Sequence, residues 1–102
     1  MIRHIVLFRV GTDDPAERER RVGVIAGALE PLVGVVPGVR SLTVDPDPDG
    51  AGTHWDAALV SMHDSWEALA QYQAHPEHVA AAAIVNTVAT DRAVVDAAER
   101  EG

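Results

Sequence analysis

Histidine is the residue type in this sequence best suited to acid–base chemistry. An imidazole with its ordinary pKa of about 6.5 can both accept and return a proton at neutral pH. The chain has five histidines and one tyrosine, Tyr72. His75 and His78 lie three residues apart and could share one face of a helix, but the chain has no cysteine and no third ligand at a standard spacing. We therefore expect no metal ion and no cofactor.

His78 is a candidate general base, and Tyr72 is a candidate donor to an oxygen that gains negative charge during a reaction. The two residues are six apart with Pro76 between them, so they face one cavity only if the chain turns there. In the alternative, structural interpretation, Tyr72 packs in the core with its hydroxyl bonded to the backbone. His75 then caps the helix that begins at Pro76, and His78 has no chemical role.

The first strand carries further candidates. Residues 2–10 are rich in β-branched and aromatic side chains, which favours a strand. His4 and Phe8 share one face of this strand with apolar residues. A histidine in such surroundings is more often a core or interface residue than a catalyst, yet the same face could line a cavity. We expect His4, Phe8 and His75 to contribute to binding, and we expect His63 to lie in solvent.

Helix signals follow the first strand. Asp14 can cap a helix with Pro15 at its first position, and Pro31 is expected to kink or end that helix. The Asp64–Glu67 stretch has a second capping pattern, and Pro76 can begin a third helix that runs to residue 88. Three more strands are expected, with a mobile loop between the first two of them and fraying at the chain end. Their ranges are 39–45, 55–63 and 91–96, the loop covers 46–53, and the fraying end covers 97–102.

The resulting order is β-α-β-β-α-α-β within a single domain over residues 1–102. This order predicts an α+β, ferredoxin-like fold, in which a four-stranded antiparallel sheet carries its helices on one face. The strand at 2–10 has apolar residues on both faces, although one layer of helices covers only one. We therefore expect two copies to pack sheet against sheet, forming a homodimeric α/β barrel.

Charge limits the partners. The chain has 8 basic and 16 acidic residues, giving a formal net charge of −8 and a pI of about 4.8. Such a field repels phosphate backbones and anionic lipid, so we expect neither nucleic acid nor membrane as a partner. The N-terminus lacks the layout of a signal peptide, and no apolar stretch approaches 18 residues. We expect a cytoplasmic protein.

Four segments resemble one known family. They are the opening IRHIVLF at 2–8, the VPGV turn at 36–39, the YQAHPEHV run at 72–79 and the closing DRAVVD at 91–96. With these segments the chain resembles the stress-responsive A/B barrel (Dabb) domain family over residues 1 to 96. The Tyr-x-x-His-Pro-x-His run is the most specific of the matches. The resemblance implies a ferredoxin-like protomer and a homodimer with a joint barrel.

The family resemblance implies more than one function. Some members resemble polyketide cyclases such as the plant olivetolic acid cyclase, which close a linear polyketide by an intramolecular aldol step. The catalytic Tyr and His of those cyclases fall on Tyr72 and His78. A further His of their third strand falls near Ala57, which cannot replace it and puts the substrate in doubt. The alternatives are a non-enzymatic stress-responsive or ligand-binding dimer, and a degradative enzyme resembling a cofactor-free monooxygenase.

Overall fold

The computed structural model describes residues 1–48 and 53–100. Its elements follow the order β-α-β-β-α-α-β, with a short 3₁₀ helix after the first α-helix. They are β1 (Ile2–Arg9), α1 (Pro15–Leu29), η1 (Glu30–Gly34), β2 (Val39–Pro46), β3 (Ala57–His63), α2 (Trp66–Ala74), α3 (Pro76–Val85) and β4 (Asp91–Ala98). The predicted α+β, ferredoxin-like fold is confirmed.

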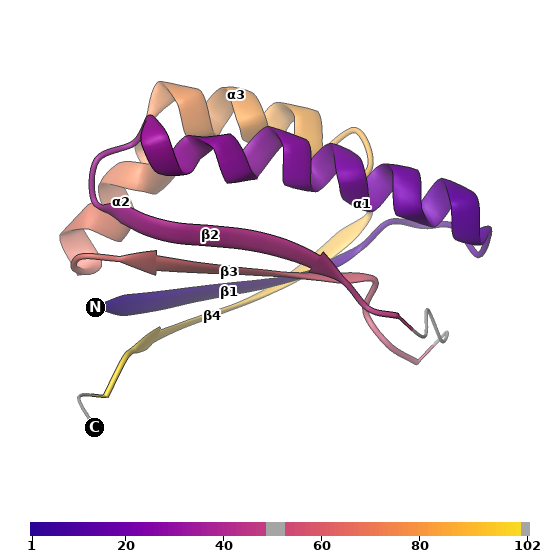
Figure 1. Cartoon of the computed structure of the whole chain (residues 1–102), viewed down its shortest axis with the longest axis horizontal. Helices are drawn as coiled ribbons and strands as arrows, with labels where there is room; N and C mark the ends of the chain where they lie inside the picture. The colour runs from indigo at the N-terminus through magenta and orange to yellow at the C-terminus, as the bar shows by residue number, and fades with distance from the viewer. Residues whose placement is uncertain (49–52, 101–102) are drawn as a thin grey trace.

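The sheet is antiparallel throughout, in the order β2-β3-β1-β4. All helices lie on one side of it, as Figure 1 shows. The central strand β1 lies between β3 and β4, and the register of these pairs fixes which side chains meet. Phe8 pairs with Ala57 of β3 on one side and with Arg92 of β4 on the other. Because directly paired residues point to the same face, Phe8 and Arg92 both point toward the helices.

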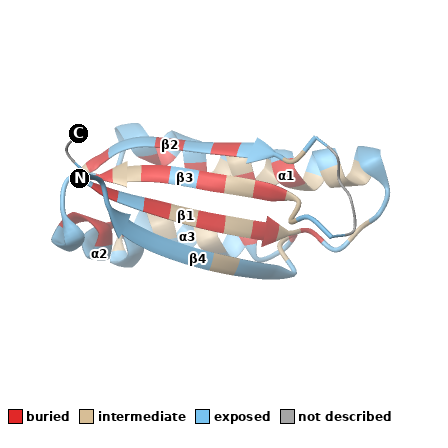
Figure 2. Ribbon diagram, turned by 90° about the horizontal axis from the view of Figure 1, so that it is seen from below, coloured by how far each residue is buried: buried red, intermediate tan, exposed pale blue. Residues whose placement is uncertain are grey.

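The two faces of the sheet differ in burial. On β1 the residues that point toward the helices are buried, whereas Ile5 and Leu7 on the other face are only half-buried. Figure 2 shows this alternation along β1 and β3, with β4 exposed at the edge. We call the second face the open sheet face. Its apolar residues are Ile5, Leu7, Ala58, Val60, Met62, Ala93, Val95 and Ala97.

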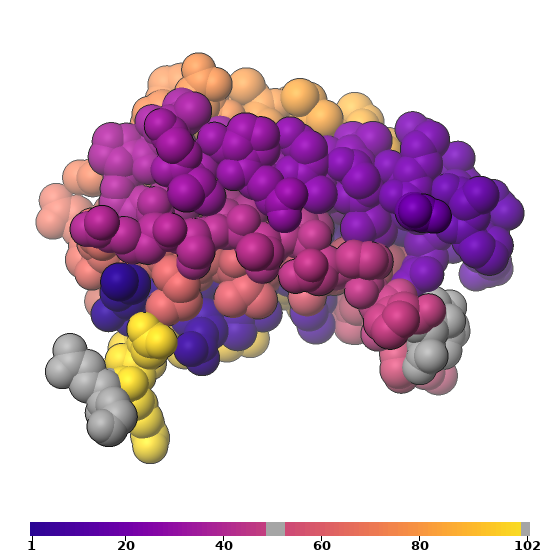
Figure 3. Space-filling model, in the orientation of Figure 1, coloured from indigo at the N-terminus to yellow at the C-terminus, as the bar shows by residue number. Residues whose placement is uncertain are grey.

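The expected caps begin the helices. The Asp14 carboxylate accepts a hydrogen bond from the Glu17 amide at 3.0 Å at the start of α1. The Ser65 hydroxyl accepts one from the Ala68 amide at 3.0 Å at the start of α2. α1 ends at Leu29, two residues before Pro31, and continues as η1. Helix α1 covers the near side of the molecule as a continuous layer above β2 (Figure 3).

The last strand is longer than the sequence indicated. Fraying was expected from residue 97, but Ala97 and Ala98 pair with Arg3 and Ile2, and the Glu99 amide donates to the Met1 carbonyl at 2.8 Å. The backbone of β1 offers partners along its whole length, and these extend β4. Residues 101–102 of the fraying end, and 49–52 of the loop expected to be mobile, lie outside the described residues.

Within the described residues, no helix is long and apolar enough to cross a membrane. The cytoplasmic location stays a prediction.

Candidate active site

A cavity of about 160 Å³ lies between the sheet and the helical layer. Its wall is mostly apolar, with a few polar groups. The lining residues are His4, Val6, Phe8, Leu29, Leu59, Tyr72, Gln73, His78, Ala82, Val85, Arg92 and Val94. Four of the five residues proposed from the sequence, namely His4, Phe8, Tyr72 and His78, are thus brought together. The fifth, His75, is not among the lining residues.

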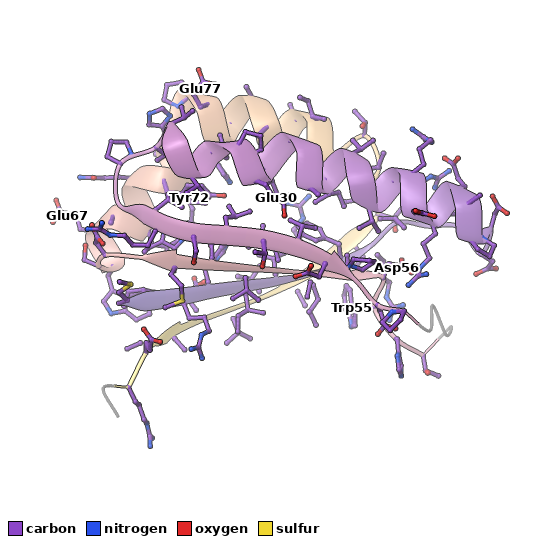
Figure 4. The ribbon with its side chains drawn as sticks, in the orientation of Figure 1. Glu30, Trp55, Asp56, Glu67, Tyr72 and Glu77 are labelled. Carbon is purple, nitrogen blue, oxygen red and sulfur yellow. The ribbon has the colours of Figure 1, made fainter. Side chains whose placement is uncertain are left out.

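The polar groups come from four elements, and one of these elements lies at the opposite end of the chain from the other three. β1 contributes His4, α2 contributes Tyr72, α3 contributes His78, and the edge strand β4 contributes Arg92. Tyr72 extends from α2 into the space between the helices and the sheet (Figure 4). Its side chain is almost completely buried, with 1% of its surface exposed. This arrangement needs the complete fold, because α2, α3 and β4 follow one another near the end of the chain whereas β1 lies at its beginning.

His75 controls the junction between α2 and α3. It ends α2 with an extended backbone (φ −64°, ψ 136°), and its ring caps α3 by accepting a hydrogen bond from the Glu77 amide at 3.1 Å. The chain therefore turns at the Pro76 break. As a result, the rings of Tyr72 and His78 lie 4.5 Å apart, measured between centroids.

The hydrogen bonds of His78 fix its tautomer. Its Nδ1 atom lies 3.1 Å from the Gln73 carbonyl oxygen. A carbonyl only accepts, so Nδ1 must carry the proton, and the neutral ring presents a free electron pair on Nε2. Burial lowers the pKa of His78, the Gln73 bond opposes this, and electrostatic effects from His4 and Arg92 lower the pKa further. The ring is therefore a neutral base at pH 7.

Tyr72 provides a hydrogen-bond donor rather than a base. Burial raises the pKa of its hydroxyl to about 12, so it stays protonated and can donate a hydrogen bond. Its ring lies 4.9 Å from that of His63 and 6.5 Å from that of His4, measured between centroids. Tyr72 is thus the centre of a cluster of three histidines.

His4 is held by an acidic partner. Its Nδ1 atom lies 2.5 Å from the Oδ1 atom of Asp96 on the neighbouring strand. His4 is buried, with 7% of its surface exposed. The carboxylate orients the imidazole and fixes Nδ1 as the protonated nitrogen. Such a pair can bind a polar substrate group or carry a proton.

The expectation that His63 lies in solvent is wrong. The residue is completely buried, and its Nε2 atom lies 2.8 Å from the Ser61 hydroxyl. Its Nδ1 atom is the one buried side-chain nitrogen or oxygen of the described residues that has no hydrogen-bond partner. Burial lowers the pKa of His63, and the nearby His4 adds to this effect. His63 is the last residue of β3, and its side chain points to the helical face.

Sequence reasoning also missed Asp96 and Arg92. Both lie on β4, on the face that turns toward the helices, and pair in register with His4 and Phe8. Arg92 and Asp96 are the β4 residues directly opposite Phe8 and His4. The sequence could have identified them only if the register between β1 and β4 had been known. Among the described residues, no three histidine or acidic side chains form a group that could hold a metal ion. The chemistry available from these residues is proton transfer and hydrogen bonding.

Comparison with known proteins defines the family. The model of the stress responsive A/B barrel domain (Dabb) matches residues 2–99. The chain belongs to this Dabb family. The match covers β1 to β4 and so includes every residue that lines the cavity. Among curated proteins, none matches the sequence significantly.

Solved structures show the same ferredoxin-like fold. A dimeric protein of unknown function and ferredoxin-like fold from Bacteroides fragilis is 33% identical, covering 94% of this chain and 93% of its own, with a TM-score of 0.81. A dimeric ferredoxin-like protein of unknown function from Thermobifida fusca is 32% identical, covering 96% and 90%, with a TM-score of 0.76. An antibiotic biosynthesis monooxygenase is 13% identical, covering 99% and 100%, with a TM-score of 0.73. That last likeness shows the fold alone.

Proposed function

We propose that the cavity of this Dabb protein binds a small, partly apolar carbonyl compound and catalyses proton transfer next to the carbonyl, in the manner of a polyketide cyclase. One observation carries the proposal. A neutral imidazole with a free Nε2 and a protonated phenol have ring centroids 4.5 Å apart on the wall of one cavity. A base and a hydrogen-bond donor side by side are what the formation of an enolate requires.

The reaction would proceed in three steps without an added reagent. Nε2 of His78 takes a proton from the carbon next to the carbonyl, and the Tyr72 hydroxyl donates to the oxygen that becomes negative. The enolate carbon then forms a bond to a second carbonyl carbon of the same molecule. The new alkoxide takes the proton back from His78, so the product is a cyclic isomer of the substrate.

The pair of His4 and Asp96 would support this chemistry from the sheet. Its imidazole lines the same cavity and is oriented by the carboxylate at 2.5 Å. We assign it to substrate binding: because Nδ1–H is bonded to Asp96, the free Nε2 can accept a hydrogen bond from a hydroxyl or enol group of the substrate. Phe8 and the other apolar lining residues would hold the hydrocarbon part of the substrate.

The functional unit would be a homodimer. The open sheet face carries apolar side chains, and Val60 and Val95 are 36% and 60% exposed in the single chain. Apolar patches of this kind mark interaction sites on small domains. Two proteins more than 30% identical to this chain are described as dimeric. A second copy packed on this face would cover it and leave the cavity on the helical side.

The experiment that tests the chemistry measures exchange of α protons. Phenylacetone, a ketone with an apolar ring, is incubated in D₂O with the protein, and the loss of its α-proton signals is followed by NMR. We expect His78→Ala to reduce the catalysed rate by about 100-fold or more, as general bases contribute on this order. Tyr72→Phe keeps the ring and removes the hydroxyl, and it should reduce the rate as well. His54→Ala is the matched control, because that histidine is exposed and outside the cavity.

The outcomes separate the alternatives. Catalysed exchange that survives both His78→Ala and Tyr72→Phe would contradict the assigned roles. Saturable binding of the ketone without exchange would favour the non-enzymatic, ligand-binding dimer. Oxygen uptake during the same incubation would favour the alternative of a cofactor-free monooxygenase.

A further inference from the structure

Arg92 gives the cavity a charge that the proposed proton transfer does not use. Of the described residues that line the cavity, Arg92 alone is permanently positive. It lies on β4, whose register with β1 places it beside Phe8. Its guanidinium carbon is 5.9 Å from the centre of the Phe8 ring, which forms part of the cavity wall.

The position of Arg92 is fixed by a neutral partner. Its Nη2 group donates a hydrogen bond to the side-chain oxygen of Asn86, the residue that ends α3. The side chain thus spans from the edge strand to the end of the helix that carries His78. Arg92 remains exposed to solvent, so it lies where the cavity opens.

Within the described part of the chain, the Arg92 guanidinium forms no ion pair with a carboxylate. This distinguishes it from five other arginines. Those five form ion pairs: Arg3, Arg18, Arg20, Arg21 and Arg40. The two acids of β4 have other partners, since Asp96 pairs with His4 and Asp91 accepts a hydrogen bond from the backbone amide of residue 92. A guanidinium at the mouth of an apolar cavity is therefore available to an anionic ligand.

We propose that the ligand of this cavity is a carboxylate, bound with its apolar part against Phe8 and its charged end at Arg92. This inference rests on the proposed function, because it names the class of compound that the same cavity takes. A carboxylate fits a single planar guanidinium, which offers it two parallel N–H donors.

The charge balance around His78 supports the same assignment. Burial lowers the pKa of His78 most, and the charge of Arg92 is one of the electrostatic effects that lower it further. A bound carboxylate would offset the charge of Arg92. The imidazolium that forms when His78 takes a proton would then be less unfavourable, so the anionic end of the ligand would assist the step at its other end.

Binding of a matched pair of probes tests this proposal. Isothermal titration calorimetry compares 3-phenylpropanoate with 3-phenylpropanamide, which has the same ring and chain but no charge. We expect the acid to bind roughly tenfold more tightly than the amide at low salt, and we expect added salt to reduce the difference. Arg92→Gln should remove the preference, and Arg92→Lys should keep part of it. Arg40→Gln removes the same charge at an exposed site outside the cavity and should leave the preference unchanged.

Each result decides between the two proposals. Equal affinity for acid and amide, or a preference that survives Arg92→Gln, would overturn the role of Arg92 while leaving a ligand-binding cavity in place. If neither probe binds at millimolar concentration, the cavity is not a ligand site for compounds of this class. That result would overturn the inference and also count against the proposed function.

Discussion

Nδ1 of His4 and Oδ1 of Asp96 lie 2.5 Å apart across the pairing of β1 with β4, although the two residues are 92 positions apart in the chain. The histidine is 8% exposed at its side chain and the carboxylate 29%. The bond therefore joins a buried group to the edge strand. It links the last strand to the first and orients the His4 imidazole on the cavity wall.

Asp96→Ala should destabilise the fold. The substitution leaves a buried imidazole N–H without its acceptor, which costs about 1–3 kcal/mol. Urea unfolding followed by circular dichroism measures the change. The control is Glu99→Gln, which breaks the exposed pair between Arg3 and Glu99 and should change the free energy of unfolding by less than about 1 kcal/mol. Equal effects of the two substitutions would show that the His4 bond contributes no more than a surface pair.

The buried His63 should make the fold sensitive to acid. Because burial lowers its pKa, the folded chain binds fewer protons than the unfolded chain as pH falls below about 6.5. The contribution of neutral, buried His63 to the free energy of unfolding is fully present above that pH. It is lost as pH falls through the lowered pKa of the folded state. For one such group the loss is at most about 1.4 kcal/mol per pH unit.

A double variant, His63→Phe with Ser61→Ala, isolates this effect. Phenylalanine keeps a ring against Tyr72, and alanine avoids leaving the buried Ser61 hydroxyl without its partner. Urea unfolding at about pH 7.5 and about pH 5.5 should show a smaller acid-induced loss of stability in the variant than in the parent chain. The remaining titrating groups are common to both chains and cancel in the difference. An unchanged pH dependence would mean that His63 is protonated as easily in the folded state as in the unfolded state.

Gly38 should tolerate no side chain. Its φ is +83°, and a Cβ there would lie 2.9 Å from the Cβ of Ala68 at the start of α2. Gly38→Ala should destabilise the fold by roughly 1–3 kcal/mol, because it combines a left-handed backbone with a steric overlap. Gly23→Ala is the control. That glycine lies on the exposed side of α1 with nothing within 4 Å, so alanine should stabilise the helix by about 0.5–1 kcal/mol. Thermal unfolding of both variants checks the opposite signs.

A charge on the open sheet face should break the proposed homodimer. Val60 is paired with Ile5 on β1, in the middle of that face. Val60→Asp should shift the protein toward single chains, because burying an unpaired carboxylate between two sheets is strongly unfavourable. Val79→Asp places the same charge on an exposed site of α3 and should leave the assembly unchanged. Sedimentation velocity measures both. A parent protein that sediments as a single chain at micromolar concentration would contradict the dimer itself.

Local signals in the sequence were sufficient for most of the fold. Asp14 and Ser65 cap their helices through bonds to residues three positions on, so their role can be read from a short window. The two-sided apolar pattern of β1 likewise follows from alternation within residues 2–9. These features depend only on residues that are close in the sequence, so they can be predicted without knowing the fold.

The site was harder to predict because it depends on register. His63 ends β3 directly before the signals of a helix, and this proximity suggested a solvated position. Alternation with Ala57, Leu59 and Ser61 assigns it to the buried face, but Val60 and Met62 make the other face equally apolar. Arg92 and Asp96 join the site only through the pairing of β4 with β1. The residues next to either position do not reveal the register of that pairing.

The break at His75 also sets a constraint on the length of the chain. In an unbroken helix each residue turns by about 100°, so positions six apart would point about 120° away from each other. Tyr72 and His78 meet only because one helix stops and another starts between them. Inserting or deleting a single residue at this joint would rotate His78 about the axis of α3 and turn its imidazole away from the Tyr72 phenol. The number of residues in this joint is therefore as much a part of the chemistry as the two side chains themselves.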